Sequence, residues 1–234
     1  MKKGVASLVI LALGTAPQLG VAQSVRPDGQ LDKAVAAGTV GTAYQLPFAS
    51  VGNSIELSIA NAASLPLSKV TVEAAAVPGW IRFKETRQTL RWLKANQELP
   101  VLFTFSVDKI APVGKEASIS FRIVSSTGES WTREIRVSVA PPEQFELFQN
   151  YPNPFNPTTT ISYQLPTDSR VHLKVFDLLG REVATVVDET EAAGYHQKTF
   201  DATRLSSGMY VYQIVATDKN GSRQIAQKAM VLVK

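Results

Sequence analysis

Hydrophobic and polar residues alternate along most of the chain from residue 42 onward. Successive side chains of a β-strand point to opposite faces, so a period of two predicts strands with one face in a core and the other in water. Up to residue 141 the apolar sets are Ile55, Leu57 and Ile59; Val70 and Val72; Val101, Phe103, Phe105 and Val107; Ile119, Phe121 and Ile123; and Ile135, Val137 and Val139. Turn sequences such as Pro78-Gly79 separate the sets, which predicts an Ig-like β-sandwich over residues 42–141.

The same alternation returns in residues 158–234. Its apolar sets are Ile161, Tyr163 and Leu165; Val171, Leu173 and Val175; Tyr210, Tyr212 and Ile214; and Val231 and Val233. Asn220-Gly221 between two alternating runs predicts a hairpin, because both positions tolerate a positive φ. Between the two regions, Pro141-Pro142 interrupts any strand. The sequence therefore predicts an all-β fold with two Ig-like β-sandwich domains in tandem, joined by a Pro-rich linker and entry strand at residues 142–157.

The first residues have the composition of a Sec signal peptide. Lys2 and Lys3 precede an apolar run from Val5 to Leu13, and small residues then lead to Ala22 and Gln23. This order predicts a signal peptide over residues 1–22, cleaved between Ala22 and Gln23, with a linker at 23–41. A membrane-spanning helix needs roughly 20 apolar residues, and this run is much shorter. We therefore expect the Sec translocon as a partner and no transmembrane anchor.

Composition excludes several classes of protein. The formal charge is +4, and it falls to about +2 once Lys2 and Lys3 leave with the signal peptide. Basic residues are not interleaved with aromatic residues in any run, so no nucleic acid partner is expected. The chain contains no Cys, which excludes disulfides, thiol catalysis and Cys-based zinc sites. Stability must come from burial of apolar side chains.

Four short motifs occur in order between residues 145 and 234. The first is Asn150-Tyr151-Pro152-Asn153-Pro154, where the prolines are expected to hold an extended backbone. The second is the turn Asp177-Leu178-Leu179-Gly180-Arg181. The third is Ser207-Gly208-Met209-Tyr210, and the fourth is a last strand with Lys228 and Lys234. Taken singly, these motifs have structural explanations. Gly180 suits a turn position with a positive φ, and Asp177 can accept hydrogen bonds in an Asx turn. Tyr210 is expected to pack in the core.

Taken together, the four motifs closely resemble the C-terminal sorting domain, type A, of the bacterial type IX secretion system. The stretch Phe155 to Thr159 also resembles the Ig-like domain of flagellar-hook-capping proteins, for which the same fold is implied. The resemblance implies that the partners are the type IX secretion machinery and its sorting protease. It further implies a transient stay in the periplasm, removal of the domain near residues 141–145, and release or attachment to surface lipopolysaccharide or polysaccharide. The implied location is the cell surface or the extracellular space.

Catalytic chemistry is not indicated. His172 and His196 alternate with apolar residues and are expected to face solvent, and the sequence has no HExxH, GxSxG or P-loop motif. The acidic residues Asp188, Glu189 and Glu191 lack the ligand spacing of a calcium loop, so a solvated turn is the expected structure. We therefore expect a protein that is not an enzyme and that needs no cofactor and no metal.

Three alternatives remain open for the cargo and its tail. Trp80 and Trp92 are candidate sugar-stacking residues of a carbohydrate-binding or adhesion module, although core packing is the commoner role of such rings. Carboxylates such as Glu73 and Glu85 leave a small hydrolase open. The C-terminal unit could also be an Ig-like assembly domain that stays on the mature protein. Exposure of the two tryptophan rings distinguishes a sugar-binding face from a packed core.

Overall fold

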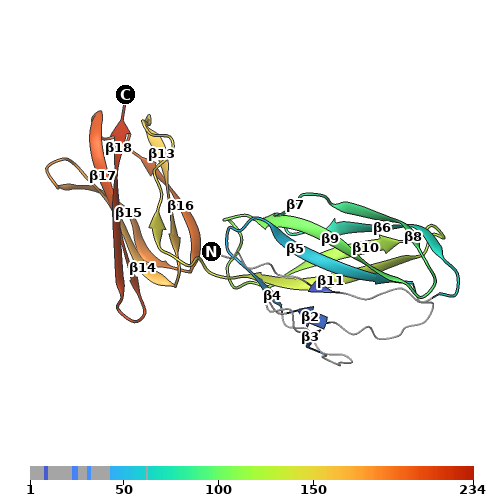
Figure 1. Ribbon diagram of the computed structural model, residues 1–234. Coiled ribbons are helices and arrows are strands. Elements are labelled where there is room, and N and C mark those ends of the chain that lie inside the picture. Colours follow the sequence, from blue (N-terminus) through green and yellow to red (C-terminus); the bar gives the residue numbers. More distant parts are fainter. Residues whose placement is uncertain (1–7, 10–22, 26–30, 33–42, 62) are drawn as a thin grey trace. The chain divides into compact units, whose positions relative to one another are not determined.

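The structure is a computed structural model that describes residues 8–9, 23–25, 31–32, 43–61 and 63–234. All regular secondary structure in these residues is β-strand, so the predicted all-β fold class is confirmed (Figure 1). The chain divides into two compact units, one ending at Ala140 and one spanning Pro141–Lys234. Most of the predicted signal peptide, including Ala22, lies outside the described residues, while Gln23 begins a short strand.

The first unit contains two sheets that enclose one core (Figure 1). One sheet has the strand order β4-β11-β10-β6-β8, and the other has the order β5-β9-β7. All pairs are antiparallel except β4 with β11, which are parallel. The strands are β4 (Tyr44–Leu46), β5 (Asn53–Ala60), β6 (Leu67–Ala76), β7 (Ile81–Phe83), β8 (Arg87–Leu93), β9 (Glu98–Val107), β10 (Ala117–Val124) and β11 (Ser130–Val139).

The five predicted apolar sets of this unit all lie on core-facing sides of strands, in β5, β6, β9, β10 and β11. A cluster of aromatic rings fills the middle of the core, where the Phe103 and Phe121 centroids are 5.1 Å apart. Alternation did not reveal β4, β7 and β8, because the first two are very short and β8 mixes Leu90 and Leu93 with polar residues on both faces.

Three further short strands, β1 (Leu8–Val9), β2 (Gln23–Val25) and β3 (Leu31–Asp32), pair antiparallel in the order β1-β2-β3. Two of them fall in the stretch 23–41 that was predicted as a linker, and the remainder of that stretch is outside the described residues. The described chain contains no helix with the length and apolarity needed to cross a membrane.

The second unit is also a two-sheet sandwich, with strand orders β12-β13-β16 and β15-β14-β17-β18. Every strand pair in it is antiparallel. Its core contains the predicted residues Ile161, Leu173 and Ile214, all fully buried. The strands are β12 (Glu146–Leu147), β13 (Thr158–Leu165), β14 (Ser169–Phe176), β15 (Glu182–Glu191), β16 (Gly194–Asp201), β17 (Gly208–Asp218) and β18 (Arg223–Leu232).

The segment 142–157, predicted as a linker and entry strand, contributes to this second core. Strand β12 pairs with β13, and Leu147 and Phe155 are both buried among the core residues. The backbone around the prolines bends instead of running extended as predicted. The Tyr151-Pro152 and Asn153-Pro154 peptide bonds are cis. Burial of Phe155 after this bent stretch places the first motif directly against the sandwich.

Candidate functional site

The first motif is fixed through the buried side chain of Asn150. Its amide group donates to the Pro152 carbonyl at 3.0 Å and to the Thr159 hydroxyl at 2.9 Å. Its backbone N–H donates to the Tyr212 hydroxyl at 2.9 Å, and that hydroxyl donates in turn to the Phe148 carbonyl at 2.9 Å. Burial raises the pKa of Tyr212 to about 12. The phenol therefore stays protonated at neutral pH and joins the motif to β17.

The rest of the first motif covers the edge of the last strand, β18. The Asn153 side-chain oxygen accepts from the Val231 N–H at 2.9 Å. Phe155 forms a parallel bridge with the end of β18, because its N–H donates to the Val231 carbonyl and its carbonyl accepts from the Val233 N–H. Unpaired strand edges are prone to uncontrolled pairing with other chains. The motif removes that hazard over the last residues of β18.

The second motif forms the turn between β14 and β15. Asp177 accepts from the backbone N–H groups of Leu179 and Arg181 at 2.9 and 3.0 Å, and from the Arg181 guanidinium at 2.7 Å. The hydrogen bonds from Arg181 lower the pKa of Asp177. Gly180 has the positive φ, 77°, that the sequence predicted. The side chains of Leu178 and Leu179 project from this turn, with Leu179 78% exposed.

The third and fourth motifs lie side by side. Gly208 of β17 is opposite Leu232 of β18, and Tyr210 is buried, with its hydroxyl donating to the Ser206 carbonyl. Lys234 donates through its backbone N–H to the Ser207 hydroxyl at 3.1 Å and through Nζ to the Thr203 carbonyl at 2.7 Å. The terminal lysine therefore holds the loop at residues 202–207. Lys228 lies opposite Tyr212 in the same strand pair.

All four motifs therefore converge at one end of the second sandwich. The first motif contacts β18, the fourth holds the 202–207 loop that precedes the third, and the second leads into β15. Between the start of β15 and this loop is a cleft of about 570 Å³. Its walls are formed by Val183, Ala184, Phe200, Asp201, Thr203, Arg204 and Leu205. The sequence did not predict the cleft, because the loop has no periodic pattern.

Residues 149–229 match the family model of the secretion system C-terminal sorting domain. The match covers all of the first three motifs and Lys228, and it confirms the resemblance found in the sequence. A sorting domain of this family indicates that the chain is cargo of the type IX secretion system. No curated protein matches the chain at a significant level.

The solved structures with similar folds are distant in sequence. The dimeric latent PorU of Porphyromonas gingivalis is 12% identical, with a TM-score of 0.34, over 84% of this chain and 19% of that one. A protein of unknown function from Porphyromonas gingivalis W83 is 13% identical, with a TM-score of 0.33, over 81% and 94%. The calcium binding domain CBD12 of CALX1.1 is 9% identical, with a TM-score of 0.35, over 79% and 78%.

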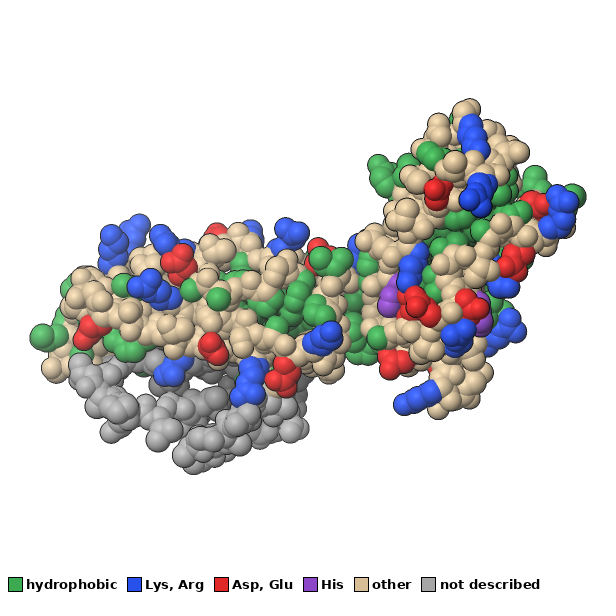
Figure 2. Space-filling view, turned by 180° about the vertical axis from the view of Figure 1, so that it is seen from behind, with side chains coloured by type: hydrophobic (Ala, Val, Ile, Leu, Met, Phe, Trp, Pro, Cys, Tyr) green, Lys and Arg blue, Asp and Glu red, His purple; other side chains and the backbone are tan. Residues whose placement is uncertain are grey.

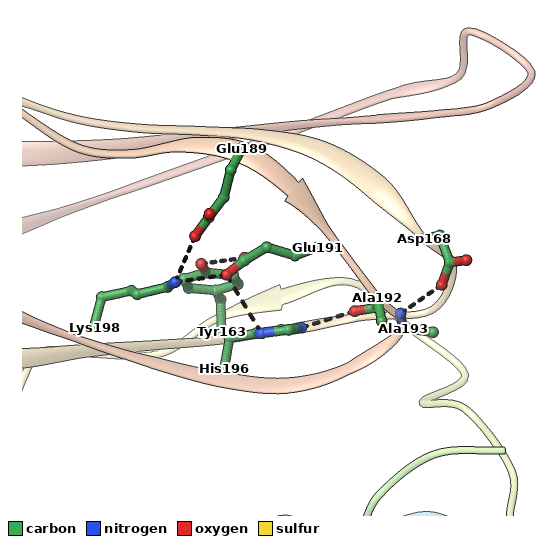
Figure 3. Close-up of polar contacts among 8 residues, drawn as sticks. All are labelled: Tyr163, Asp168, Glu189, Glu191, Ala192, Ala193, His196 and Lys198. Carbon is green, nitrogen blue, oxygen red and sulfur yellow. Dashed lines mark hydrogen bonds and ion pairs between the residues drawn. The ribbon is translucent and has the colours of Figure 1, made fainter. Parts of the chain in front are cut away.

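A second polar group in the sorting domain surrounds the carboxylate of Glu191, only 8% exposed (Figure 3). The Tyr163 hydroxyl donates to Oε2 of Glu191 at 2.5 Å, and Lys198 Nζ lies 2.8 Å from Oε1. Burial, together with the nearby carboxylate, raises the pKa of Tyr163. The hydrogen bond to Glu191 raises the pKa of Lys198. Glu191 ends β15 in one sheet, while Tyr163 and Lys198 belong to the other, so the group ties the two sheets together.

Two expectations about this region were wrong. Asp188, Glu189 and Glu191 do not form a solvated turn, because all three lie within β15 and each pairs with a cation. His196 is only partly exposed, because its ring stacks on Tyr163 and its Nε2 contacts the Ala192 carbonyl at 2.8 Å. His172 is on the outer face as expected, 3.0 Å from Asp188. Strand parity could not have singled out Glu191, because Glu189 shares the parity of Val187 and is exposed.

The candidate residues of the first unit have different surroundings. Trp80 packs against the core, and Trp92 is 54% exposed at the end of β8. Glu73 accepts from Arg87 at 2.9 Å, and Glu85 from Gln88 at 2.8 Å. In the described residues no group of three or more His, Asp or Glu side chains is arranged to hold a metal. Cationic and anionic side chains are interspersed over the visible face of each unit (Figure 2).

Proposed function

We propose that this chain is an exported, non-catalytic surface or secreted protein whose C-terminal domain directs type IX secretion and cell-surface attachment. One observation carries the proposal: residues 149–229 match the sorting-domain family, and the four motifs of that resemblance meet at one end of one folded sandwich. The geometry supports recognition of a folded surface rather than of a linear peptide, because the motifs come from segments far apart in the sequence.

The Sec translocon delivers the chain to the periplasm, and the signal peptide is cleaved between Ala22 and Gln23. The sorting domain folds, docks on the secretion machinery, and is later cut off by the sorting protease. The cut falls just before Phe145, because Glu143 and Gln144 are exposed whereas Phe145 packs against the sorting-domain core. The remaining cargo is released or joined to surface lipopolysaccharide or polysaccharide.

The cargo itself acts as an interaction or surface-layer module. Residues 42–141 contain neither His nor Cys, which removes the commonest general bases and thiol nucleophiles from the cargo. A hydrolysis assay of the full chain on a polysaccharide panel tests this part of the proposal. Polysaccharide hydrolysis by the full chain that is lost in a Glu73→Gln or Glu85→Gln variant would show that the cargo is an enzyme.

Removal of the sorting domain tests the proposed route. In a host with a type IX system, the full chain is expected at the surface or in the medium. A chain that ends at Ala140 is expected to stay in the periplasm, because nothing on it would engage the machinery. The Asn156→Ala variant of the full chain is a suitable control, since Asn156 is exposed. Surface delivery of the shortened chain would refute sorting by this domain.

A carbohydrate-binding or adhesion module that permanently retains its C-terminal domain is the second candidate, and the exposed ring of Trp92 favours it. A flat aromatic face on the surface suits stacking against a sugar ring. Trp80, which packs on the core, is the matched control. Retention of the full chain on a polysaccharide gel that is lost in Trp92→Ala would support this candidate. Equal migration of the unmodified chain in gels with and without polysaccharide would rule out a carbohydrate-binding module.

A further inference from the structure

The cleft between the start of β15 and the 202–207 loop lies at the end of the sandwich where the sorting motifs meet. Its floor and walls include the apolar side chains Val183, Phe200 and Leu205. Phe200 also contacts Phe155, the residue directly after the first motif, with ring centroids 6.3 Å apart. The cleft is therefore supported from below by the segment that covers β18.

The third and fourth motifs hold the loop that forms one side of the cleft, and the second motif leads into the other side. Tyr210 of the third motif donates to the Ser206 carbonyl, and Lys234 of the fourth donates to the Thr203 carbonyl. The loop also receives support from the chain after the first motif, because the Ala202 N–H donates to the Pro157 carbonyl at 3.0 Å. The opposite side begins directly after the Asp177–Arg181 turn. The four motifs and the residues next to them therefore fix the positions of both sides of this cleft.

The rim of the cleft is positively charged on balance. Arg204 is exposed on the rim, and the ammonium group of Lys234 lies against the same loop. The Asp201 carboxylate is already used, because it accepts from the N–H and hydroxyl of Thr203 at 2.8 and 2.5 Å. Those hydrogen bonds, and then the charges of Arg204 and Lys234, lower the pKa of Asp201. A partner that fills the cleft therefore needs an apolar side chain and an acidic neighbour.

We propose that the secretion machinery recognises the sorting domain at this cleft, by inserting an apolar side chain next to Leu205 while a carboxylate of the same partner segment pairs with Arg204. The inference rests on the proposed function, because it names the recognition surface of the sorting domain. Apolar anchors in pockets surrounded by charged rims are typical of protein interfaces, where the rim charges mainly set specificity and association rate.

Charge reversal at the rim tests the inference in the full chain, expressed in a host with a type IX system. We expect Arg204→Glu to lower the ratio of surface to periplasmic protein about tenfold, because like charges in contact disfavour the complex. Arg204→Gln, which removes the charge and keeps most of the side chain, is expected to cause a smaller loss. Lys219→Glu is the matched control: Lys219 is also exposed but lies in the β17–β18 turn, and its reversal is expected to leave export unchanged.

Thermal unfolding of each purified precursor separates recognition from folding. Unchanged unfolding of Arg204→Gln together with reduced export supports the inference. Normal export of Arg204→Glu, or equal losses for Arg204→Glu and Lys219→Glu, overturns it. The chain ending at Ala140 is measured alongside. If that chain stays in the periplasm while Arg204→Glu is exported normally, the cleft inference fails and the sorting function stands. If the shortened chain reaches the surface, the sorting function itself fails.

Discussion

The Val231 N–H donates a hydrogen bond of 2.9 Å to the side-chain oxygen of Asn153, which lies 78 positions earlier in the chain. This contact joins the first sorting motif to the last strand of the domain. Asn153 sits between two prolines, which lack backbone N–H groups, so its side chain makes the contact with the edge of β18. The order of the motifs in the sequence does not show that the first motif contacts the last strand.

Replacement of Asn153 by Ala is expected to destabilise the sorting domain by about 1 kcal/mol, the net contribution of one such hydrogen bond. The unfolding midpoint of this domain should fall by about 4–8 °C for a domain of this size. Differential scanning calorimetry of the full chain measures the change. Asn156→Ala, three positions on, removes an exposed side chain and should leave the midpoint unchanged. Equal midpoints for both variants would show that the Asn153 contact does not contribute.

Glu191→Ala should be far more damaging than its neighbour Glu189→Ala. Glu191 is buried and accepts from Tyr163 and Lys198, so its loss leaves a buried phenol without a partner. Removal of one partner from such a group costs about 2–4 kcal/mol. Glu189 also pairs with Lys198 but is well exposed, where an ion pair contributes little. Urea denaturation of both variants tests the contrast, and comparable losses would contradict it.

The Glu191 group also predicts loss of stability at alkaline pH. The pKa values of Tyr163 and Lys198 are raised above their ordinary 10.0 and 10.5. The folded domain therefore retains protons that the unfolded chain releases, so this stabilisation is complete below about pH 10 and declines as the pH rises further. In urea denaturation between about pH 9 and 11, Tyr163→Phe should show a shallower decline than the parent. An identical slope in both proteins would refute the assignment.

Gly180 should tolerate Asn much better than Val. Its φ is 77°, and no atom lies within 4 Å of the position that a Cβ would occupy. The cost of a substitution is therefore backbone strain alone, about 1–2 kcal/mol for an ordinary residue and less for Asn, which adopts this conformation more readily. Calorimetry that finds Gly180→Asn at least as destabilising as Gly180→Val would show that the turn requires glycine for another reason.

Strand positions could be predicted from the sequence because alternation directly reflects which side of a strand is buried. Ile119, Phe121 and Ile123, for example, are all fully buried, as the pattern required. The hairpin at Asn220-Gly221 was also predicted correctly: Asp218 accepts from the N–H groups of Asn220 and Ser222. Of the two positions, Gly221 has a positive φ and Asn220 does not.

The polar contacts of the site could not be predicted in the same way. The partners of Asn150, Tyr163 and Lys234 depend on strand register and on how the two sheets face each other, and a local pattern contains neither. For Tyr163 the sequence indicated that a partner exists but not which residue it is, since a phenol at a core position needs a hydrogen-bond partner. Its stacking on His196 and the cleft beside Leu205 follow only from the folded arrangement.

Cell fractionation with intact-mass measurement distinguishes a sorted protein from one that keeps its C-terminal domain. The full chain is expressed in a host with a type IX system, and the mass of the protein is measured in the periplasmic, surface and medium fractions. We expect surface or medium protein that has lost the signal peptide and all residues from about Phe145 onward, apart from any added polysaccharide. Protein that keeps its sorting domain and remains in the periplasm would contradict this expectation.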